Sequence, residues 1–449
     1  MLFRSKTSPK TWDAWIYYHG GTYYQYYLIS ERYVCDGFGV ATSTDGVAWK
    51  DHGWVLGHSD RMVRYLGSGS VWRNLDPANG RRFLCNYSEW RMDGERNVQS
   101  IFFAASDDLL TWHKAGDDLA FRIDEKYYRR IEPNAKGPWE DPRWDGICVV
   151  PAAQGGYHGY WTATPRDCLG FGYGTSPDGL HWKAEPPPSI DWGGTPSMYF
   201  IEVGGVERIG SRYYAMLGDY ASVNCGMFSF VSDGPQGPFR PSPKNYSLLQ
   251  NKSRMHAYFT RFLQSPDGIL VNHHSIAEGD FSAEHCVVYY APLKKAAIID
   301  ECLYLCWWPG NDRLKSRPLA LSYDTAGLRF DPGHGLLFEG TADSSGHLII
   351  GHEGSNTTDI RIGEDSVVEI GLGIAAGDEC RCLERVDRQI SFGKRKRLLL
   401  LLRHTMMELY INDILIQCYT MEKPVNGWLT FAQIEDVRSW SWDVDDQAG

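Results

Sequence analysis

Short runs of β-branched and aromatic residues dominate the hydrophobic pattern of this chain. Turn-forming Gly, Pro, Asn and Asp residues bound these runs, as they do around residues 21–28 and 211–217. Such bounded runs are typical of β-strands. Few segments carry apolar residues at the i, i+3, i+4 and i+7 positions that an amphipathic helix needs. We therefore expect an all-β protein.

A repeated unit in the first half of the chain predicts a β-propeller. Each copy reads as a strand, a Ser-x-Asp turn and an aromatic residue that opens the next strand. The copies, the last of them degenerate, occupy residues 39–49, 103–112, 172–182 and 230–239. Their serines lie 63, 70 and 56 residues apart, which leaves room for about four strands per copy, as in a propeller blade. With a further strand around residues 287–291, we expect a five-bladed propeller over residues 1–325.

The aspartates of these turns, Asp45, Asp108 and Asp178, are candidates for catalytic acids only at first sight. An Asp side chain in such a turn caps the turn by hydrogen bonding to its own backbone. We therefore expect all three to be turn caps.

The sequence pattern changes after about residue 325, where the predicted strands follow one another closely. We expect a C-terminal β-sandwich over residues 326–449. Within it, Asn412-Asp413 stands between two apolar runs, where a tight hairpin turn belongs.

Charge and cysteine content narrow the class of protein. The net charge is −11 over 449 residues and the chain has no long basic stretch, so nucleic acid is not an expected partner. The longest apolar run, residues 398–402, is far shorter than the roughly 20 residues of a membrane span. No apolar signal segment opens the sequence, and the 11 cysteines form neither a disulfide framework nor zinc-ligand pairs. We expect a cytoplasmic protein without a metal, a cofactor or a membrane partner.

Three acidic residues stand near the starts of successive blades. Asp13 precedes the first strand run, Asp141 precedes the third blade and Glu202 enters the fourth. Inner strands of a propeller converge on a central funnel, so these carboxyl groups are expected to meet there. Glycosidic bond cleavage uses two carboxyl groups, one as acid and one as nucleophile or base. The apolar neighbours of Glu202 suit it to hold a proton, because burial raises the pKa of a carboxyl group.

The order of several motifs resembles glycoside hydrolase family 32, the invertase, inulinase and levanase group. Ser68-Gly69-Ser70 matches the family's Ser-Gly-Ser motif. Glu140-Asp141-Pro142 stands in place of Arg-Asp-Pro, Glu202-Val203 in place of Glu-Cys, and Asp13 in the segment that carries the nucleophile. The resemblance implies a retaining enzyme with a propeller and a sandwich module, acting on an oligosaccharide.

The resemblance also implies roles for individual residues. Asp13 would be the nucleophile and Glu202 the acid/base, while Asp141 would hold sugar hydroxyls and stabilise the transition state. The substrate-binding residues would be Trp12, Ser68, Trp139, Glu140 and Arg143. Trp15, Trp90 and Trp144 could also stack on sugar faces, although core packing is the more common role of such residues.

Departures from the family pattern leave the sugar open. Glu140 replaces an arginine and so reverses a charge in the expected pocket, with Arg143 nearby to compensate. Fructose is the default sugar, and transfer of a fructosyl group to another sugar is a variant of hydrolysis. An inverting propeller glycosidase, similar to families 43, 62 or 117, is the first alternative. A carbohydrate-binding propeller that has lost its activity is the second. Linkage and oligomeric state stay open.

Overall fold

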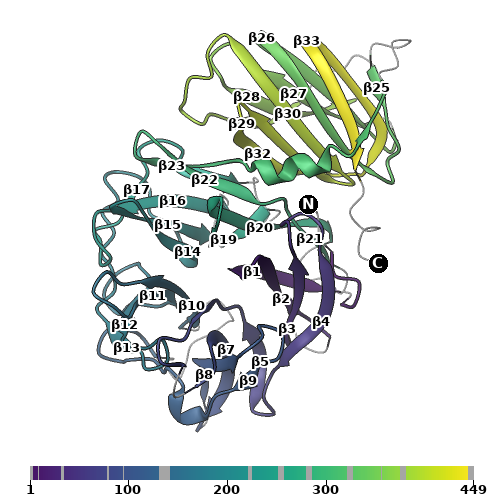
Figure 1. The fold of residues 1–449 in the computed structure, drawn as a ribbon. Coiled ribbons are helices and arrows are strands. Elements are labelled where there is room, and N and C mark those ends of the chain that lie inside the picture. The colour runs from purple at the N-terminus through teal and green to yellow at the C-terminus, as the bar shows by residue number, and fades with distance from the viewer. Residues whose placement is uncertain are drawn as a thin grey trace.

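The computed structural model describes most of the chain as β-strands arranged in a ring with further strands stacked on one side (Figure 1). The only helices within the described ranges are short 3-10 helices such as Asp117–Leu119 and Pro309–Leu314. The all-β prediction is confirmed. The described residues are 4–8, 10–31, 35–77, 80–94, 96–130, 142–220, 225–250, 257–279, 286–320, 327–354, 356–374 and 381–442.

Four small antiparallel sheets form most of the ring (Figure 1). The first contains β1 (Thr11–His19), β2 (Thr22–Ile29), β3 (Gly37–Ser43) and β4 (Lys50–Gly57). The second contains β5 (Met62–Gly67), β6 (Val71–Arg73), β7 (Phe83–Asp93), β8 (Arg96–Ser106) and β9 (His113–Lys114). The third contains β10 (Trp144–Pro151), β11 (Tyr157–Ala163), β12 (Gly172–Ser176) and β13 (Lys183–Glu185). The fourth contains β14 (Glu202–Ile209), β15 (Arg212–Asp219), β16 (Gly226–Ser232), β17 (Arg240–Pro241) and β18 (Ser247–Gln250).

The repeated Ser-x-Asp units are the turns that lead out of the third strand of these sheets. In the first copy, Asp45 Oδ1 accepts hydrogen bonds from the backbone N–H groups of Val47 and Ala48, at 2.9 Å each. Asp108 and Asp178 accept the equivalent pairs of bonds in the next two copies. The prediction that the three aspartates are turn caps is confirmed.

The prediction of five blades is wrong. The strand around residues 287–291 belongs to a 15-stranded sheet that runs from the ring into the C-terminal part of the chain. The join is the pairing of β23 with β32 at Cys306 and Ile414. Its ring strands are β19 (Ala257–Ser265), β20 (Gly268–Gly279), β21 (Cys286–Tyr290), β22 (Lys294–Ile299) and β23 (Cys302–Trp307).

The remaining strands of this sheet enclose a second hydrophobic core. They are β24 (Arg317–Pro318), β25 (Gly327–Arg329), β26 (Gly335–His352), β27 (Asn356–Ile362), β28 (Val368–Ile374), β29 (Arg381–Val386), β30 (Arg395–Arg403), β31 (Met406–Ile411), β32 (Ile414–Thr420) and β33 (Val425–Trp442). Cys302 and Tyr304 of β23 pack into the same core. The contacts therefore cross the predicted division between residues 1–325 and 326–449, and both that division and the β-sandwich stay predictions.

The hairpin between β31 and β32 has the turn that its sequence predicts. Asn412 and Asp413 are its two loop residues, with Ile411 paired to Ile414. Both have positive φ angles, 48° and 68°. Two successive left-handed residues are what a type I′ turn requires, so this prediction is confirmed.

Two further features bear on the class of protein. Within the described ranges, no helix is long and apolar enough to cross a membrane. The ten cysteines of those ranges are all free.

Candidate active site

The first strands of the four small sheets, together with β2 and β19, surround a cavity of about 130 Å³. Three carboxyl groups and an arginine line it among apolar and aromatic side chains. The lining residues are Trp12, Asp13, Leu28, Cys35, Tyr65, Leu66, Gly67, Ser68, Arg143, Asp145, Glu202, Tyr220 and Tyr258.

The first strand of each sheet is irregular where it reaches the cavity. The register of β1 against β2 shifts between Thr11 and Ala14, so Asp13 lies in the irregular stretch. The register of β10 shifts directly after Asp145, and that of β14 shifts directly after Val203, the residue that follows Glu202. A bulge bends a strand and redirects its side chains. The bulges therefore turn all three carboxyl groups toward the same space.

Glycine is required in one of these bulges. Gly146 has a φ of 58°, and a Cβ atom there would lie 2.7 Å from the carbonyl oxygen of Ser68. Glycine alone tolerates both the positive φ and the close approach. Asn86 fixes the next residue, because its side chain accepts a bond from the N–H of Ile147 and donates one to its carbonyl oxygen, both at 2.9 Å.

Asp13 is buried, with 8% of its surface exposed. Its Oδ1 atom has no hydrogen-bond partner among the described residues. Burial raises the pKa of Asp13 well above its usual range, and the negative charge of Glu202 raises it further, while Arg261 and Arg143 oppose both effects.

Glu202 is the first residue of β14 and faces the same cavity. Burial raises the pKa of Glu202, and so does the charge of Asp145, while Arg143 lowers it. The charge of Glu202 also raises the pKa of Asp13, and two carboxyl groups that interact in this way lose their protons in two separate steps. The pair thus has a pH range in which one carboxyl group is protonated and the other is charged.

Asp145 is the third carboxylate of the cavity, and sequence reasoning missed it. It accepts hydrogen bonds from Ser88 Oγ at 2.5 Å and from Arg143 Nη2 at 2.6 Å. Sequence reasoning chose Asp141 instead, because Glu140-Asp141-Pro142 is similar to a family motif. Trp139, Glu140 and Asp141 lie outside the described residues. Asp145 could have been found from its place at the start of its sheet's first strand, because Asp13 and Glu202 also stand near the starts of first strands. Gly146, which follows Asp145, is a second signal, because glycine often marks a bulge.

Arg143 connects the polar groups of the cavity. Besides its bond to Asp145, its Nη1 atom donates to the hydroxyl oxygen of Tyr220 at 3.2 Å. Its Nη2 atom also lies 3.6 Å from Oε1 of Glu202. The guanidinium group is almost completely buried, with 12% of the side chain exposed. Arg143 was predicted as a substrate-binding residue, and the structure places it between two of the three carboxylates.

The buried side-chain amide of Gln99 supports the pair formed by Asp145 and Arg143. The side chain of Gln99 is inaccessible to solvent. It donates to Ser88 Oγ at 3.0 Å and to the hydroxyl of Tyr65 at 3.4 Å, and it accepts the backbone N–H of Trp144 at 3.0 Å. Gln99 thereby fixes the serine that binds Asp145.

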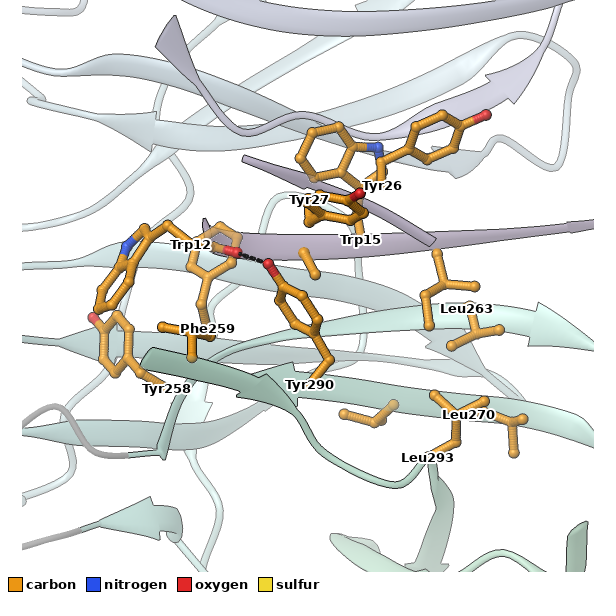
Figure 2. Packing of buried hydrophobic residues seen from close by; sticks show 14 of the residues in the cluster. Trp12, Trp15, Tyr26, Tyr27, Tyr258, Phe259, Leu263, Leu270, Tyr290 and Leu293 are labelled. Atoms are coloured by element: carbon orange, nitrogen blue, oxygen red, sulfur yellow. Dashed lines mark hydrogen bonds between the residues drawn. The ribbon is translucent and has the colours of Figure 1, made fainter. Parts of the chain in front are cut away.

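The tryptophans expected near the substrate divide into two groups. Trp12 lines the cavity, and Figure 2 shows it beside Tyr258, with its carbonyl oxygen accepting a 2.7 Å hydrogen bond from the Tyr290 hydroxyl. Ser68 lines the cavity as well. The other tryptophans of the described ranges that were weighed as stacking residues lie in the core, at 2% exposure or less: Trp15, Trp90 and Trp144.

The adjacent histidines of β20 point to opposite faces of the strand, as their sequence positions predict. His274 faces Asp13, whereas His273 lies 3.6 Å from Glu408 of β31. Donor atoms of His273, Glu408 and Cys418 lie within 4.8 Å of one another, so their types and spacing could suit a metal ion. The ammonium group of Lys294, which is bonded to Glu408, already provides a positive charge there.

Comparison with known proteins identifies the fold. No protein-family model matches the sequence, and no curated protein matches it. A GH32 β-fructofuranosidase of Bombyx mori has a TM-score of 0.71 at 12% identity, covering 99% of this chain and 93% of that one. Sucrose-6-phosphate hydrolase of Lactobacillus gasseri has a TM-score of 0.68 at 16% identity, covering 97% and 91%. Fructan 1-exohydrolase IIa of Cichorium intybus, as a variant in complex with 1-kestose, has a TM-score of 0.67 at 13% identity, covering 99% and 97%. The predicted resemblance to family 32 is confirmed at the level of the fold.

Proposed function

We propose that this protein is a glycoside hydrolase that cleaves a fructofuranosyl or related furanosyl linkage in a short oligosaccharide. One observation carries the proposal: Asp13, Asp145 and Glu202 reach one cavity from the first strands of three different sheets. The fold shared with β-fructofuranosidases and a fructan exohydrolase supports the choice of sugar.

The proposed reaction is a double displacement that retains the anomeric configuration. Glu202, in its protonated form, donates its proton to the glycosidic oxygen while Asp13 attacks the anomeric carbon and the leaving sugar departs. Glu202, now a carboxylate, then takes a proton from water, and the oxygen of that water displaces Asp13 from the sugar. The negative charge of Glu202 raises the pKa of Asp13, and such an interaction between two carboxyl groups favours the states in which the pair holds one proton.

Asp145 and Arg143 have a supporting role in this proposal. Asp145 stays bound to Arg143 and Ser88, and therefore offers oriented oxygen atoms to sugar hydroxyl groups. Hydrogen bonds to sugar hydroxyls that strengthen in the transition state contribute to glycosidase catalysis. From its sequence position Asp141 was expected to have this role, and the experiments below separate the two residues.

The test is a hydrolysis screen of purified protein. The panel contains sucrose, 1-kestose, short inulin- and levan-type oligosaccharides, difructose anhydrides and aryl arabinofuranosides. Glu202→Gln and Asp13→Asn should each abolish fructose release while circular dichroism and thermal unfolding stay unchanged. Glu207→Gln is the matched control, since Glu207 is also buried and lies on β14 but does not line the cavity.

Each alternative has its own signature in this screen. Methanol added to the reaction should trap a methyl furanoside of the same anomeric configuration as the substrate, whereas an inverting enzyme would give the opposite anomer. Activity on arabinofuranosides alone would contradict fructose as the sugar and favour the alternative of a propeller glycosidase similar to families 43, 62 or 117. Binding without turnover on every substrate would favour a carbohydrate-binding protein.

A further inference from the structure

His274 of β20 lies behind Asp13 and has no part in the reaction described above. Its side chain is completely buried. Its Nδ1 atom lies 3.7 Å from Oδ1 of Asp13, and the centre of its ring lies 4.5 Å from that of Trp12. The imidazole therefore contacts two neighbouring residues of the bulge that aims Asp13 into the cavity.

The facing atoms of this pair both lack a hydrogen bond. Neither nitrogen of His274 has a partner among the described residues, and neither has Oδ1 of Asp13. A neutral imidazole carries one N–H donor and one acceptor nitrogen. Buried donors without an acceptor are rare in folded proteins. The carboxylate oxygen opposite Nδ1 is an acceptor that such a donor needs.

The backbone around His274 holds the ring in place. His274 is the cross-strand partner of Tyr258 on β19 and of Tyr290 on β21. Tyr258 lines the cavity, and the Tyr290 hydroxyl donates to the carbonyl oxygen of Trp12 (Figure 2). On the opposite face of the strand, His273 packs against Glu408. The strand is thus fixed from both sides.

The charge state of His274 follows from its surroundings. Burial, with a smaller effect from His273, lowers the pKa of His274 to about 3, so the ring is neutral at ordinary pH. The charged groups that act on Asp13 are Glu202, Arg261, Asp145 and Arg143. Because its ring is neutral, His274 can act on Asp13 through the dipole of an N–H group but adds no further charge to these groups.

We propose that His274 is a positioning residue, present as the Nδ1–H tautomer, whose N–H is directed at Oδ1 of Asp13 and closes to a hydrogen bond when Asp13 is charged. The separation of 3.7 Å is longer than a hydrogen bond, and such distances in a catalytic site commonly shorten when substrate is bound. The bond would hold the carboxylate oriented for attack. It would also favour the negative charge on Asp13 rather than on Glu202, which is the distribution that a nucleophile and a general acid require. This inference rests on the proposed function for its effect on catalysis.

The first measurement needs no substrate. In protein labelled with 15N-histidine, the ring nitrogen shifts of His274, assigned by comparison with His274→Asn, report the tautomer. We expect Nδ1 protonated and Nε2 unprotonated from about pH 5 to 9. An Nε2–H tautomer, or a doubly protonated ring in this range, would overturn the proposal.

The second measurement compares two variants in the active enzyme. His274→Asn keeps an N–H donor close to the position of Nδ1, whereas His274→Leu replaces the ring by an apolar side chain of similar size. A hydrogen bond to a charged group corresponds to roughly a ten- to hundredfold effect. We expect His274→Leu to lower kcat/KM by about that factor, mainly through kcat, and His274→Asn to restore most of it.

The pH profile separates positioning from packing. Loss of a donor to Asp13 raises the pKa of that carboxyl group, so the acid limb of kcat/KM should move to higher pH in His274→Leu and stay in place in His274→Asn. If both folded variants lose activity equally with an unshifted acid limb, His274 only fills space and the proposal is wrong. A wild-type protein without turnover would contradict the proposed function, while the tautomer measurement would still decide the placement of the N–H.

Discussion

The Nη2 atom of Arg143 lies 2.6 Å from Oδ2 of Asp145, and both side chains are almost completely buried. A charge-assisted hydrogen bond of this length is among the stronger interactions in a protein. It holds the guanidinium group where its charge also acts on Asp13 and Glu202. Arg143 therefore influences the protonation of both carboxyl groups in the proposed reaction.

Replacing Arg143 by methionine should move the whole pH profile of kcat/KM to higher pH. Arg143 lowers the pKa of Asp13 and of Glu202, so its loss raises both. The acid limb reports ionisation of the nucleophile and the alkaline limb reports loss of the acid's proton, and both limbs therefore shift in the same direction. Arg143→Lys keeps the charge and should shift neither limb. It should still lose activity, because one ammonium group cannot make the bonds to Asp145 and Tyr220 in the geometry of the guanidinium group. A shift of one limb alone would contradict this assignment.

Asp145→Asn and Asp141→Asn identify the third carboxylate. Because Asp145 lines the cavity between Arg143 and Ser88, we expect Asp145→Asn to reduce kcat by about three orders of magnitude or more in a protein that still folds. Its free energy of unfolding should also fall, because Arg143 loses a buried ionic partner. If Asp141→Asn causes the larger loss, the role belongs to the residue that the sequence motif indicated. Steady-state kinetics on the best substrate of the screen distinguish the two outcomes.

The Lys294–Glu408 pair should dominate the stability of the contact between the ring and the C-terminal strands. Both side chains are inaccessible to solvent, and removing one partner of a buried ion pair costs about 3–5 kcal/mol. Lys294→Met should therefore lower the free energy of unfolding by that amount, and the double variant with Glu408→Gln should recover part of it. Arg395→Met is the control. It removes an exposed pair with Asp436 and should change stability by less than about 1 kcal/mol.

The same pair predicts a dependence of stability on acid. Burial alone would raise the pKa of Glu408, but Lys294 and His273 lower it to about 2, below its usual value of 4.5. A carboxyl group with a depressed folded pKa stabilises the protein above its unfolded pKa, and this contribution is lost as the pH falls. Urea unfolding should therefore show stability falling between about pH 4.5 and 2. In Glu408→Gln this part of the decline should be absent, and an unchanged decline would show that other groups cause it.

Asp108→Ala should reduce stability without reducing kcat. Asp108 accepts backbone N–H bonds from Leu110 and Thr111, at 2.9 and 2.7 Å. These bonds outweigh partial burial and lower the pKa of Asp108 to about 2. We expect a loss of about 1–2 kcal/mol in thermal or chemical unfolding. Asp108→Asn keeps an acceptor oxygen and should recover much of that loss. A large fall in kcat in either variant would mean that Asp108 also has a role in catalysis.

Local signals in the sequence were sufficient for much of the fold. The turns at Asp45, Asp108 and Asp178 and the hairpin at Asn412-Asp413 depend on contacts within three residues, so residue type and spacing determine them. The opposed histidines His273 and His274 follow from the two-residue period of a strand. Sheet boundaries depend on long-range pairing instead. The pairing of Cys306 with Ile414 merges the expected fifth blade with the C-terminal strands, and nothing near residue 306 indicates it.

The site was only partly predictable for a related reason. Asp13 and Glu202 were chosen because they stand near the starts of successive blades, and both line the cavity. Asp145 was missed because motif similarity favoured a residue four positions earlier. The bulges that direct the carboxylates interrupt the alternation of side chains between the two faces of a strand. The face on which each carboxylate lies therefore could not be predicted from the sequence pattern.

The arrangement of β1 against β19 and β20 has a consequence for how the protein is made. β1 is synthesised well before its neighbours in the ring, β19, β20 and β21, which follow it by some 250 residues. A nascent chain that ends before residue 257 already contains Asp13, Asp145 and Glu202, but it lacks the strands that close the ring beside Asp13. Ring closure is therefore the step that completes the candidate site, which forms only after β19, β20 and β21 have been translated.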